Sequence, residues 1–399
     1  MNGECVSCGG LTELINYLGN HRLPDFTDPG APLPGFWPLK LVICTSCTLL
    51  QLNELTPRAS LYHDRYGFKS GINEAIRADL EDVVKSALGI VTQPASWLDI
   101  GCNDGTLLSF VPQRTWRAGI DPLGQFAGEA SQYADRIVTD YFKPEHCGNN
   151  FEVITSVSMF YDLASPGDFA RDVRSVLAPH GVWVIQQNYA LDMIRRNAID
   201  NICHEHVTYF SVTALDALMR ECGLEIFHVT YSAVNGGCFR AFVSREGKYN
   251  IKSSVGEALY REHYENLGRP AVWRRWAGDV KAELQKTMDF LTSRVTRSGN
   301  ECYLYGASTR GGTFLQIMGA GPALLIRAVE RSPAKVGKIM GSTGIPIISE
   351  EQMRQDDPEY LLVSPWFFRD VFADREAAYL DNGGRMIYPL PRFSIDRRP

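Results

Sequence analysis

The sequence predicts an α/β protein built around a doubly wound parallel sheet, with a cysteine-rich module before it and a second sheet-and-helix unit after it. Three observations carry this prediction. Short apolar strands alternate with amphipathic helices through the middle of the chain. One strand runs directly into a glycine turn and a helix. The same order returns near the C-terminus. We therefore expect four parts: residues 1–59, 60–248, 249–298 and 299–399.

Composition limits the classes of function. The chain has 399 residues, of which 45% are hydrophobic and 22% charged, as in ordinary globular enzymes. Its net charge of -6 disfavours a broad nucleic-acid-binding surface. The N-terminus lacks the features of a signal peptide, and no apolar run approaches the roughly 18 residues of a membrane span. We expect a cytoplasmic protein, without membrane or nucleic-acid partners, whose ten cysteines are thiols or metal ligands.

The N-terminal module, residues 1–59, carries two CxxC pairs. Two such turns supply the four thiolates of a closed tetrahedral zinc site, which is structural because it leaves no open position. The segment between the pairs shows little periodicity and is rich in proline and glycine, so we expect its fold to depend on the metal. Redox pairs or incidental cysteines are the alternative. The predicted zinc ligands are Cys5, Cys8, Cys44 and Cys47.

Residues 60–248 contain the predicted parallel sheet. Its first helix is expected over 73–88 and its first strand over 97–100, followed by the glycine turn 101–105 and a helix from 106. Further elements follow in alternation, which places ligands at the carboxyl ends of the strands. They are strands over 118–120, 137–141, 151–156, 181–186 and 225–231, and a helix over 168–177.

The glycine turn predicts the cofactor. A dinucleotide pyrophosphate would be repelled by a carboxylate in the turn, where Asn103 and Asp104 stand. S-adenosylmethionine (SAM) has no phosphate and carries a sulfonium cation and an amino group, so we favour SAM over NAD. Asp121 is placed to grip a ribose diol, and Asp140 could accept the adenine amino group. The predicted cofactor residues are Asp99, Gly101, Asn103, Asp104, Gly105, Asp121, Asp140, Tyr141 and Ser156.

An unusual cluster follows the fifth strand: Cys203, His204, Glu205, His206 and Tyr209. The two histidines are too close in sequence for a zincin helix. In an extended or irregular segment, cysteine and glutamate would point one way and the histidines the other. A histidine held by a carboxylate can act as a general base near neutral pH, which a carbon nucleophile needs before it attacks a methyl group. A second metal site and a structural hydrogen-bond cluster are the alternatives.

Two later turns are candidates for substrate binding. Asn235, two glycines and Arg240 suggest a tight turn that presents a cation, although a plain hairpin turn is the alternative. After the helical stretch 251–298, interrupted at 268–270, a strand over 301–305 leads into the glycine turn 306–312 and a helix over 313–318. This turn contains Arg310 and no acidic residue, so it suits a phosphate. A purely architectural role is the other interpretation.

Strands over 325–329 and 360–363 complete a second Rossmann-like unit, and Trp366 follows the last of them. In chain order the motifs are two CxxC pairs, the glycine turn, Cys-His-Glu-His-x-x-Tyr-Phe-Ser, Asn-Gly-Gly-x-x-Arg and Tyr-Gly-Ala-Ser-Thr-Arg-Gly-Gly-Thr. Together they resemble the sugar C-methyltransferase family, bacterial enzymes that methylate C3 of 4-keto deoxysugar nucleotides. The resemblance covers essentially the whole chain.

The resemblance implies a class I SAM methyltransferase domain, a structural zinc ion and a nucleotide-sugar substrate. It assigns the general base to His206, with Glu205 beside it and His204 and Tyr209 in the same segment. Cys203 departs from the tyrosine of many members, and Asn235 from the histidine of some. Tyr62 and Tyr66 match a tyrosine-rich stretch that lines the active site of that family, and core packing is the alternative for them. With the residues of the two later turns, the predicted substrate residues are Tyr62, Tyr66, Asn235, Arg240, Arg310 and Trp366.

Two other functions stay open at this point. One is an O- or N-methyltransferase of the same fold that acts on another small metabolite. The other is a methyltransferase that its zinc ribbon brings to RNA or to a protein, for which steep salt dependence of binding would be the sign. A scaffold without catalytic activity is a further alternative.

Overall fold

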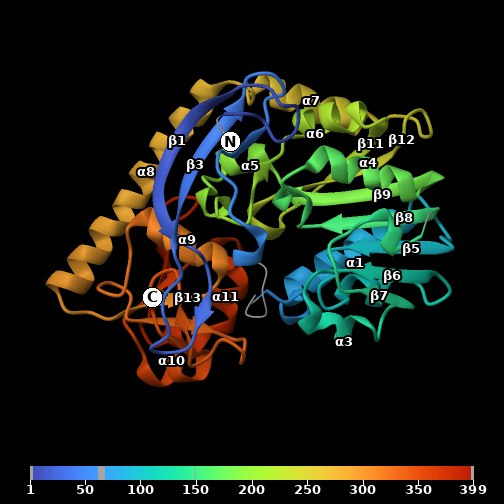
Figure 1. The fold of residues 1–399 in the computed structure, drawn as a ribbon. Coiled ribbons are helices and arrows are strands. Elements are labelled where there is room, and N and C mark those ends of the chain that lie inside the picture. The colour runs from blue at the N-terminus through green and yellow to red at the C-terminus, as the bar shows by residue number, and fades with distance from the viewer. Residues whose placement is uncertain (1–2, 62–67, 149, 397–399) are drawn as a thin grey trace.

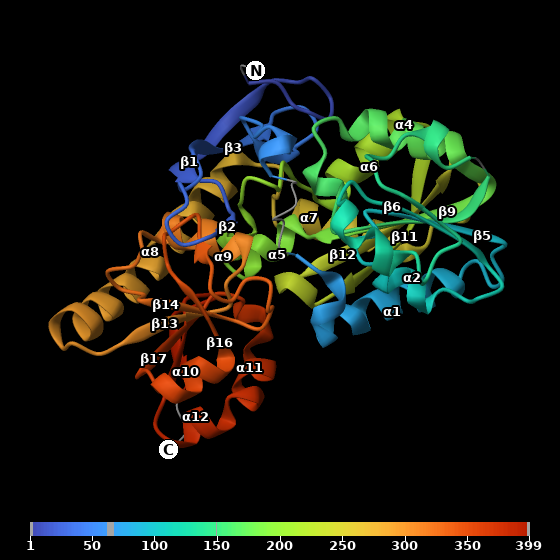
Figure 2. The same ribbon diagram turned by 60° about the horizontal axis from the view of Figure 1, so that its bottom comes forward.

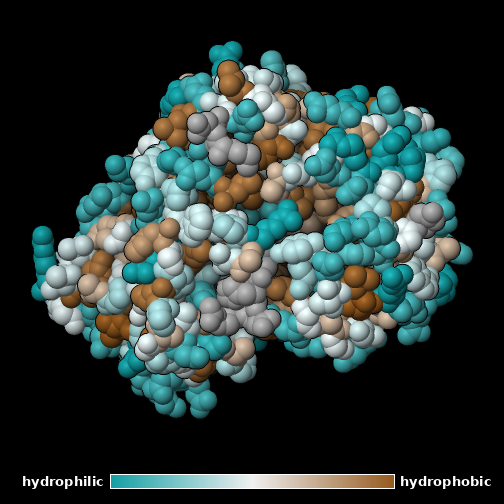
Figure 3. Space-filling view, in the orientation of Figure 1, coloured by the Kyte–Doolittle hydropathy of each residue, from teal (hydrophilic) through white to brown (hydrophobic). Residues whose placement is uncertain are grey.

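The computed structural model describes residues 3–61, 68–148 and 150–396, which form three larger sheets and a two-stranded one in an elongated, two-lobed body (Figure 1). The central sheet and its helices make one lobe, and the C-terminal domain makes the other. The N-terminal strands and the long helix α8 lie along one side of both lobes (Figures 1 and 2). None of the helices in these ranges has the length and apolar character to cross a bilayer. Polar side chains cover most of the face shown in Figure 3, with apolar ones scattered among them.

The N-terminal module is a long antiparallel hairpin rather than the irregular segment that we expected. Strand β1 (Thr12–Arg22) pairs with β3 (Phe36–Cys44), and two register shifts bend the pair. Leu39, Leu41 and Ile43 alternate into the core, a period-two pattern that the flanking prolines obscured. The sheet is completed by β4 (Leu50–Leu52) and by β10 (Thr208–Tyr209), which comes from the central part of the chain.

The central sheet has seven strands in the order β7-β6-β5-β8-β9-β12-β11. The five strands predicted to be parallel are so, and β12 lies antiparallel between β9 and β11. Strand β7 is shorter than predicted, which leaves residues 139–141 in the following loop. The strands are β5 (Ser96–Ile100), β6 (Trp116–Ile120), β7 (Arg136–Val138), β8 (Phe151–Val157), β9 (Leu177–Asn188), β11 (Leu224–Ser232) and β12 (Cys238–Arg245).

Helices cover this sheet because their apolar faces pack on the buried strands. Helix α1 (Glu74–Leu88) begins at Asn73, whose side chain accepts a hydrogen bond from the amide of Ala75. It packs against the short helix α2 and strand β9. The other helices of this part are α2 (Thr106–Phe110), α3 (Ala127–Ala130), α4 (Pro166–Val176), α5 (Ala190–Arg195) and α6 (Val212–Glu221).

The predicted helical stretch divides at the expected glycine and proline. Helix α7 (Ser253–Tyr264) packs on β11 and α6, so it covers the central sheet. Helix α8 (Pro270–Leu291) begins with its proline in the first turn, where no amide hydrogen is needed, and continues as a π-helix to Arg297. It runs against β1 and α9 and thereby contacts both the N-terminal hairpin and the C-terminal domain.

The C-terminal domain has the second Rossmann-like sheet that the sequence predicts, in the order β16-β14-β13-β17-β18-β19. Five strands are parallel, and β19 is antiparallel. Helix α9 (Thr309–Met318) starts four residues earlier than predicted because the Ser308 hydroxyl caps it. The strands are β13 (Cys302–Tyr305), β14 (Arg327–Glu330), β16 (Ile347–Ser349), β17 (Tyr360–Val363), β18 (Arg385–Tyr388) and β19 (Ser394–Asp396); the remaining helices are α10 (Glu350–Asp356), α11 (Arg369–Arg375) and α12 (Ala377–Asp381).

The N-terminal module joins both lobes. Its strand β2 (Phe26–Thr27) pairs with β15 (Ile339–Met340) of the C-terminal domain. Arg22 and Gln316 exchange hydrogen bonds of 2.8 and 3.1 Å between main chain and side chain. On the other side, β4 pairs with β10 of the central part. The module therefore links the two lobes instead of standing apart.

Candidate active site

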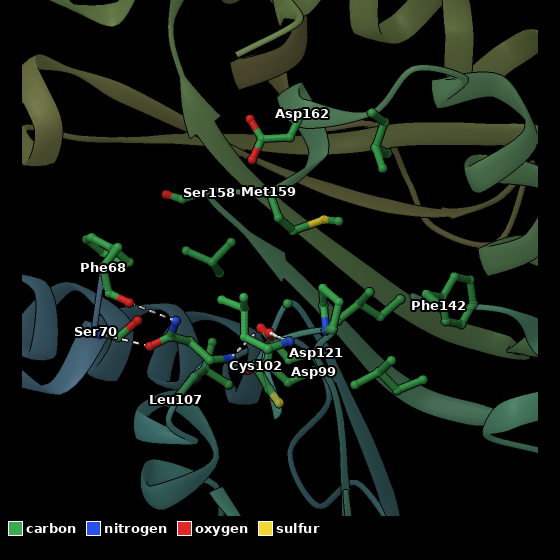
Figure 4. Close-up of a pocket in the computed structure, with 18 of the residues that line it drawn as sticks. Phe68, Ser70, Asp99, Cys102, Leu107, Asp121, Phe142, Ser158, Met159 and Asp162 are labelled. Carbon is green, nitrogen blue, oxygen red and sulfur yellow. Dashed lines mark hydrogen bonds between the residues drawn. The ribbon is translucent and has the colours of Figure 1, made fainter. Parts of the chain in front are cut away.

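A cavity of about 300 Å³ opens at the carboxyl ends of β5, β6 and β8 (Figure 4). This is the edge at which doubly wound sheets bind ligands, and the volume is that of a small-molecule site. In Figure 4 the side chains of Asp99 and Asp121 lie on one side, and Ser158, Met159 and Asp162, which follow β8, lie across from them.

The glycine turn forms the floor of this cavity. Gly101 has φ 80°, and a Cβ there would lie 2.9 Å from Met159 Cγ, so only glycine fits. The amide of Asn103 donates to Asp121 Oδ2 over 2.8 Å, which ties the turn to the end of β6. The Asn103 side chain also accepts from the amide of Ser70 (3.0 Å) and donates to the carbonyl of Phe68 (3.2 Å). These bonds close the segment before α1 over the turn (Figure 4).

The cavity is strongly acidic. Arg58 is the only cationic side chain among the lining residues that the structure describes. Burial raises the pKa of Asp99 to about 7, an effect that a hydrogen bond from Thr155 opposes. Burial also raises the pKa of Asp121. Such a lining favours a cationic ligand and repels phosphate. The acidic residues that line the cavity are Asp79, Asp99, Asp121, Asp140, Asp162 and Asp172.

Most of the predicted cofactor residues line this cavity. They are Asp99, Gly101, Asn103, Asp121, Asp140 and Tyr141, together with the substrate candidate Asn235. Asp140 and Tyr141 belong to the loop after β7 and are partly exposed, and Arg58 stacks 5.3 Å from the centroid of the Tyr141 ring. Asn235 has φ 54° in the turn before β12, so the tight turn expected there is present.

Three predicted cofactor residues do not line the cavity. Asp104 accepts from the amide and hydroxyl of Thr106, the first residue of α2, and its other oxygen accepts from the amide of Gly71. Gly105 packs against α3, where a Cβ would lie 2.7 Å from Ala130. Ser156 is fully buried and accepts a hydrogen bond from the Trp183 indole. All three lie outside the cavity lining and stabilise the segments that form it.

The sequence prediction missed several lining residues. Asp79 projects from α1 and accepts hydrogen bonds from Ser232 Oγ and Gln186 Nε2. Ser158 lies just after β8 with φ 55°, the left-handed conformation that a tight turn at a strand end requires. A helix residue packed over the sheet and a serine in an unremarkable stretch carry no sequence signal of their own.

The His-Glu-His segment forms a turn rather than an extended strand. The amide of His206 donates to the carbonyl of Cys203 over 3.2 Å, so the predicted alternation of side chains does not occur. The segment adjoins the cavity through Tyr161, whose ring lies 4.4 Å from that of His206 and whose neighbour Asp162 lines the cavity. Strand β10 follows directly and continues the N-terminal sheet.

His206 is the best-placed base of this segment. It is buried, and its Nδ1 lies 2.7 Å from the carbonyl oxygen of Asn201. A carbonyl can only accept, so Nδ1 carries the proton and Nε2 is the nitrogen able to take one. Burial, reinforced by the charge of Arg310, lowers the pKa of His206 to about 3. The imidazole is therefore neutral at physiological pH.

The other members of the segment face elsewhere. His204 contacts the N-terminal hairpin, with Nε2 3.3 Å from the carbonyl of Trp37, and burial lowers its pKa to about 4. Glu205 is buried, and burial raises its pKa while Cys203 and Thr309 stabilise the charged form. Tyr209 is buried in strand β10. The two histidines thus contact different parts of the molecule, contrary to expectation.

The prediction that Arg240 presents a cation to substrate is wrong. Its guanidinium is 3% exposed and lies beneath α1, where it donates to Gln186 (2.9 Å), Asp82 (2.9 Å) and Ser86 (2.7 Å). Arg240 lies on the face of β12 that α1 covers, so a carboxylate of that helix neutralises its charge. Arg240 holds α1 on the sheet.

Arg310 and Trp366 also bind a protein group. Arg310 Nη2 donates to Asp200 Oδ2 over 2.6 Å, and Trp366 Nε1 donates to Asp200 Oδ1 over 3.0 Å. The predicted phosphate site thus already holds a carboxylate. The remaining substrate candidates, Tyr62 and Tyr66, lie outside the described residues.

The four cysteines of the CxxC pairs converge as predicted. Their Sγ atoms all lie within 4.8 Å of one another, and the Cys5–Cys47 and Cys8–Cys44 separations are 3.6 and 3.5 Å. Sulfur atoms about 2.3 Å from a tetrahedral zinc ion would be about 3.8 Å apart, so the donor set fits. Residues 3–61, 68–148 and 150–396 contain no second cluster of this kind, so a metal at the His-Glu-His segment gains no support.

Comparisons with known proteins agree with this geometry. Residues 72–229 match the model of a methyltransferase domain, and residues 233–391 match that of the C-methyltransferase C-terminal domain. The C-methyltransferase NovU of Streptomyces niveus is 27% identical over 409 residues, and the alignment covers 97% of this chain and 95% of NovU.

Solved structures align with less than half of the chain. The N-methyltransferase NodS from Bradyrhizobium japonicum WM9, in complex with S-adenosyl-L-homocysteine, gives a TM-score of 0.36 at 14% identity and covers 46% of this chain and 93% of NodS. Magnesium protoporphyrin IX methyltransferase from Synechocystis PCC 6803 gives 0.36 at 12% identity and covers 43% and 84%. The two matched family models and the full-length relative show that the chain is a SAM-dependent methyltransferase of the class I α/β fold, similar to C-methyltransferases.

Proposed function

We propose that this enzyme transfers a methyl group from SAM to a carbon atom next to the ketone of a nucleotide-linked deoxysugar, with His206 as the general base. The observation that carries the proposal is a neutral, buried histidine beside an acidic cavity at the carboxyl edge of the sheet. The similarity to the C-methyltransferase NovU supports a carbon atom as the methyl acceptor.

The cavity suits SAM by charge. SAM, when bound, supplies an electrophilic methyl group on a sulfonium cation. Asp99 and Asp121 would hold its cationic and hydroxyl groups, since both carboxylates line the cavity and each can accept further hydrogen bonds besides those from Thr155, Asn103 and Leu123. Asn103 and Gly101 keep the floor of the cavity in place.

His206 would remove the proton from the substrate carbon. Nε2 takes that proton, the C–H electron pair forms the enolate, and the enolate carbon bonds to the methyl group while the carbon–sulfur pair returns to sulfur. A base with a pKa near 3 is weak, but a neighbouring negative charge raises the pKa of an imidazole. The developing enolate supplies that charge. The acidic cavity would repel the substrate's diphosphate, so we place the nucleotide outside it.

We also infer that Cys5, Cys8, Cys44 and Cys47 hold a structural zinc ion. The amides of Ser7 and Ser46 each approach a cysteine Sγ at 3.4 Å, which stabilises a thiolate. Gln51 of β4 joins the first knuckle to the sheet by accepting from the amide of Val6 over 3.0 Å. All four positions of the ion would be filled by protein, so its role is to hold the fold.

The variant His206→Gln tests the function. We expect its SAM affinity, measured by calorimetry, to match the wild type, and its turnover of a thymidine diphosphate 4-keto sugar to fall ~10²–10⁴-fold. In deuterium oxide, the wild type should exchange the acidic carbon-bound proton of that sugar and the variant should not. Wild-type turnover in the variant would reject His206 as the base. Methylation without any exchange would point instead to an oxygen or nitrogen acceptor.

A further inference from the structure

The C-terminal sheet has the topology of a ligand-binding domain. Strands β13 and β17 are neighbours, and the chain leaves them in opposite directions, toward β14 and β18. The crevice outside such a switch point is where open α/β sheets bind their ligands. Arg310 stands in the first turn of α9, after β13, and Trp366 stands just after β17. Both residues therefore border this crevice.

An aspartate of the central part occupies the crevice. Asp200 is 2% exposed and accepts three hydrogen bonds from the C-terminal domain: Arg310 Nη2 on Oδ2 (2.6 Å), Trp366 Nε1 on Oδ1 (3.0 Å) and Arg310 Nε on the Asp200 carbonyl (3.2 Å). Both carboxylate oxygens and the backbone are thus engaged. Charge-assisted bonds of this length are strong and directional, so the carboxylate stands where a bound anion would stand.

Asp200 is also connected to His206. It lies in the 3-10 turn Ile199–Asn201, which the amide of Ile202 closes by donating to Ile199 (2.9 Å). The next residue, Asn201, presents the carbonyl that accepts the proton of His206 Nδ1 over 2.7 Å. A displacement of Asp200 would move the carbonyl of Asn201, since Asp200 and Asn201 are joined by a peptide bond.

We propose that Asp200 is an internal ligand of the C-terminal domain and a positioning residue for His206, because the bonds from Arg310 and Trp366 fix the carbonyl that orients the imidazole. The importance of His206 in catalysis rests on the proposed function. The arrangement makes the docked C-terminal domain part of the catalytic apparatus. It also assigns Arg310 to Asp200 in place of a substrate phosphate.

The tautomer of His206 tests this proposal without any substrate. The full chain is labelled with 15N-histidine, and the His206 signals are assigned by their loss in His206→Gln. In the wild type we expect the Nδ1-protonated tautomer. Asp200→Asn keeps the size of the side chain but loses the charge that binds Arg310. We expect a mixed or exchanging tautomer in this variant, unchanged calorimetric binding of SAM, and a kcat lowered on the order of tenfold or more.

Two further variants make the test selective. Asp216→Asn is the matched control, since it removes a buried aspartate that accepts from Arg220 over 2.8 Å within α6. It should leave the His206 signals as in the wild type. Trp366→Phe removes one donor to Asp200 while keeping an aromatic ring, so it covers the case in which Asp200→Asn does not fold. It should shift the signals in the same direction by a smaller amount.

The outcomes separate the two proposals. A folded Asp200→Asn with the wild-type tautomer of His206 would overturn the positioning role, and so would an equal shift in Asp216→Asn. Activity retained in His206→Gln would instead refute the proposed function. The tautomer measurement would still decide whether Asp200 orients the imidazole, because it does not depend on turnover.

Discussion

Asp99 gives the sharpest prediction from the electrostatics of the cavity. Its carboxylate lines the cavity that we propose binds SAM, at the end of β5, and Asp99 is 3% exposed. Burial raises its pKa from the ordinary 3.8 to about 7, with a smaller contribution from Asp121 and an opposing one from Thr155. The folded protein without SAM therefore binds a proton at this site between about pH 4 and pH 7 that the unfolded chain does not bind.

The magnitude follows from the two pKa values. The difference between 3.8 and about 7 corresponds to about 4 kcal/mol. Because the folded state binds the extra proton, this group lowers the free energy of unfolding as pH rises from about 4 to about 7, and the loss is complete above 7. We therefore expect Asp99→Asn without SAM to be more stable than the wild type at pH 8, by up to about 4 kcal/mol.

Binding of SAM should favour the ionised form of Asp99. The positive charge of SAM favours the ionised carboxylate, so binding at pH 6 should release up to one proton from Asp99. The affinity should then rise by at most about tenfold per pH unit up to pH 7 and level off above it. In Asp99→Asn the proton release should disappear and the affinity should fall.

The assay is calorimetric titration of SAM at pH 6 and 8, each in two buffers of different ionisation enthalpy, with denaturant unfolding at the same pH values. Asp140→Asn is the matched control, since it removes a half-exposed carboxylate from the same cavity. It should retain the proton release of the wild type. Equal proton release in Asp99→Asn and the wild type would refute the reasoning.

Three other substitutions test the supporting structure. Gly101→Ala should abolish measurable SAM binding in calorimetry, because its Cβ would meet Met159 at 2.9 Å and its φ of 80° disfavours alanine. Arg240→Met should lower the free energy of unfolding by about 3–5 kcal/mol in denaturant titrations, since it removes the buried positive charge beside Asp79 and the donor to Gln186; an unchanged value would show that Arg240 does not hold α1 on the sheet. Cys44→Ser should reduce the zinc content measured by mass spectrometry and expose the N-terminal hairpin to limited proteolysis, whereas an intact hairpin without metal would show that the ion is dispensable.

The sequence predicted those features that depend on local pattern. The strand, glycine turn and helix at 97–110 follow from one apolar run and the glycines after it, and the parallel sheet follows from repetition of that unit. The cysteine pairs predicted their own convergence, because the spacing of each CxxC turn sets the direction of both thiols. The acidic lining was likewise visible, since Asp99 and Asp121 end adjacent strands.

The sequence could not predict which charged groups bind one another. Arg240 and Arg310 have the same residue type and similar glycine-rich surroundings, yet α1 neutralises one and Asp200 neutralises the other. Their partners stand more than 100 residues away along the chain, where no local pattern indicates them. Ser156 and Ser158 also differ: Ser156 lies inside β8 and accepts from Trp183, whereas Ser158 follows the strand with φ 55° and lines the cavity.

The placement of His206 explains why the methyltransferase sheet is joined to two further parts. Strand β10, two residues beyond His206, is held by β4 of the N-terminal module, and Asp200, six residues before it, is held by the C-terminal domain. The segment between these anchors has no partner strand in the central sheet, so its conformation depends on both neighbours. The base that we propose must take a proton from a substrate carbon that is held in line with the methyl donor, so it needs such fixed geometry, since small displacements cost much of the rate. The N-terminal module and the C-terminal domain can therefore serve one purpose, which is to hold this turn against the cavity that we propose binds SAM.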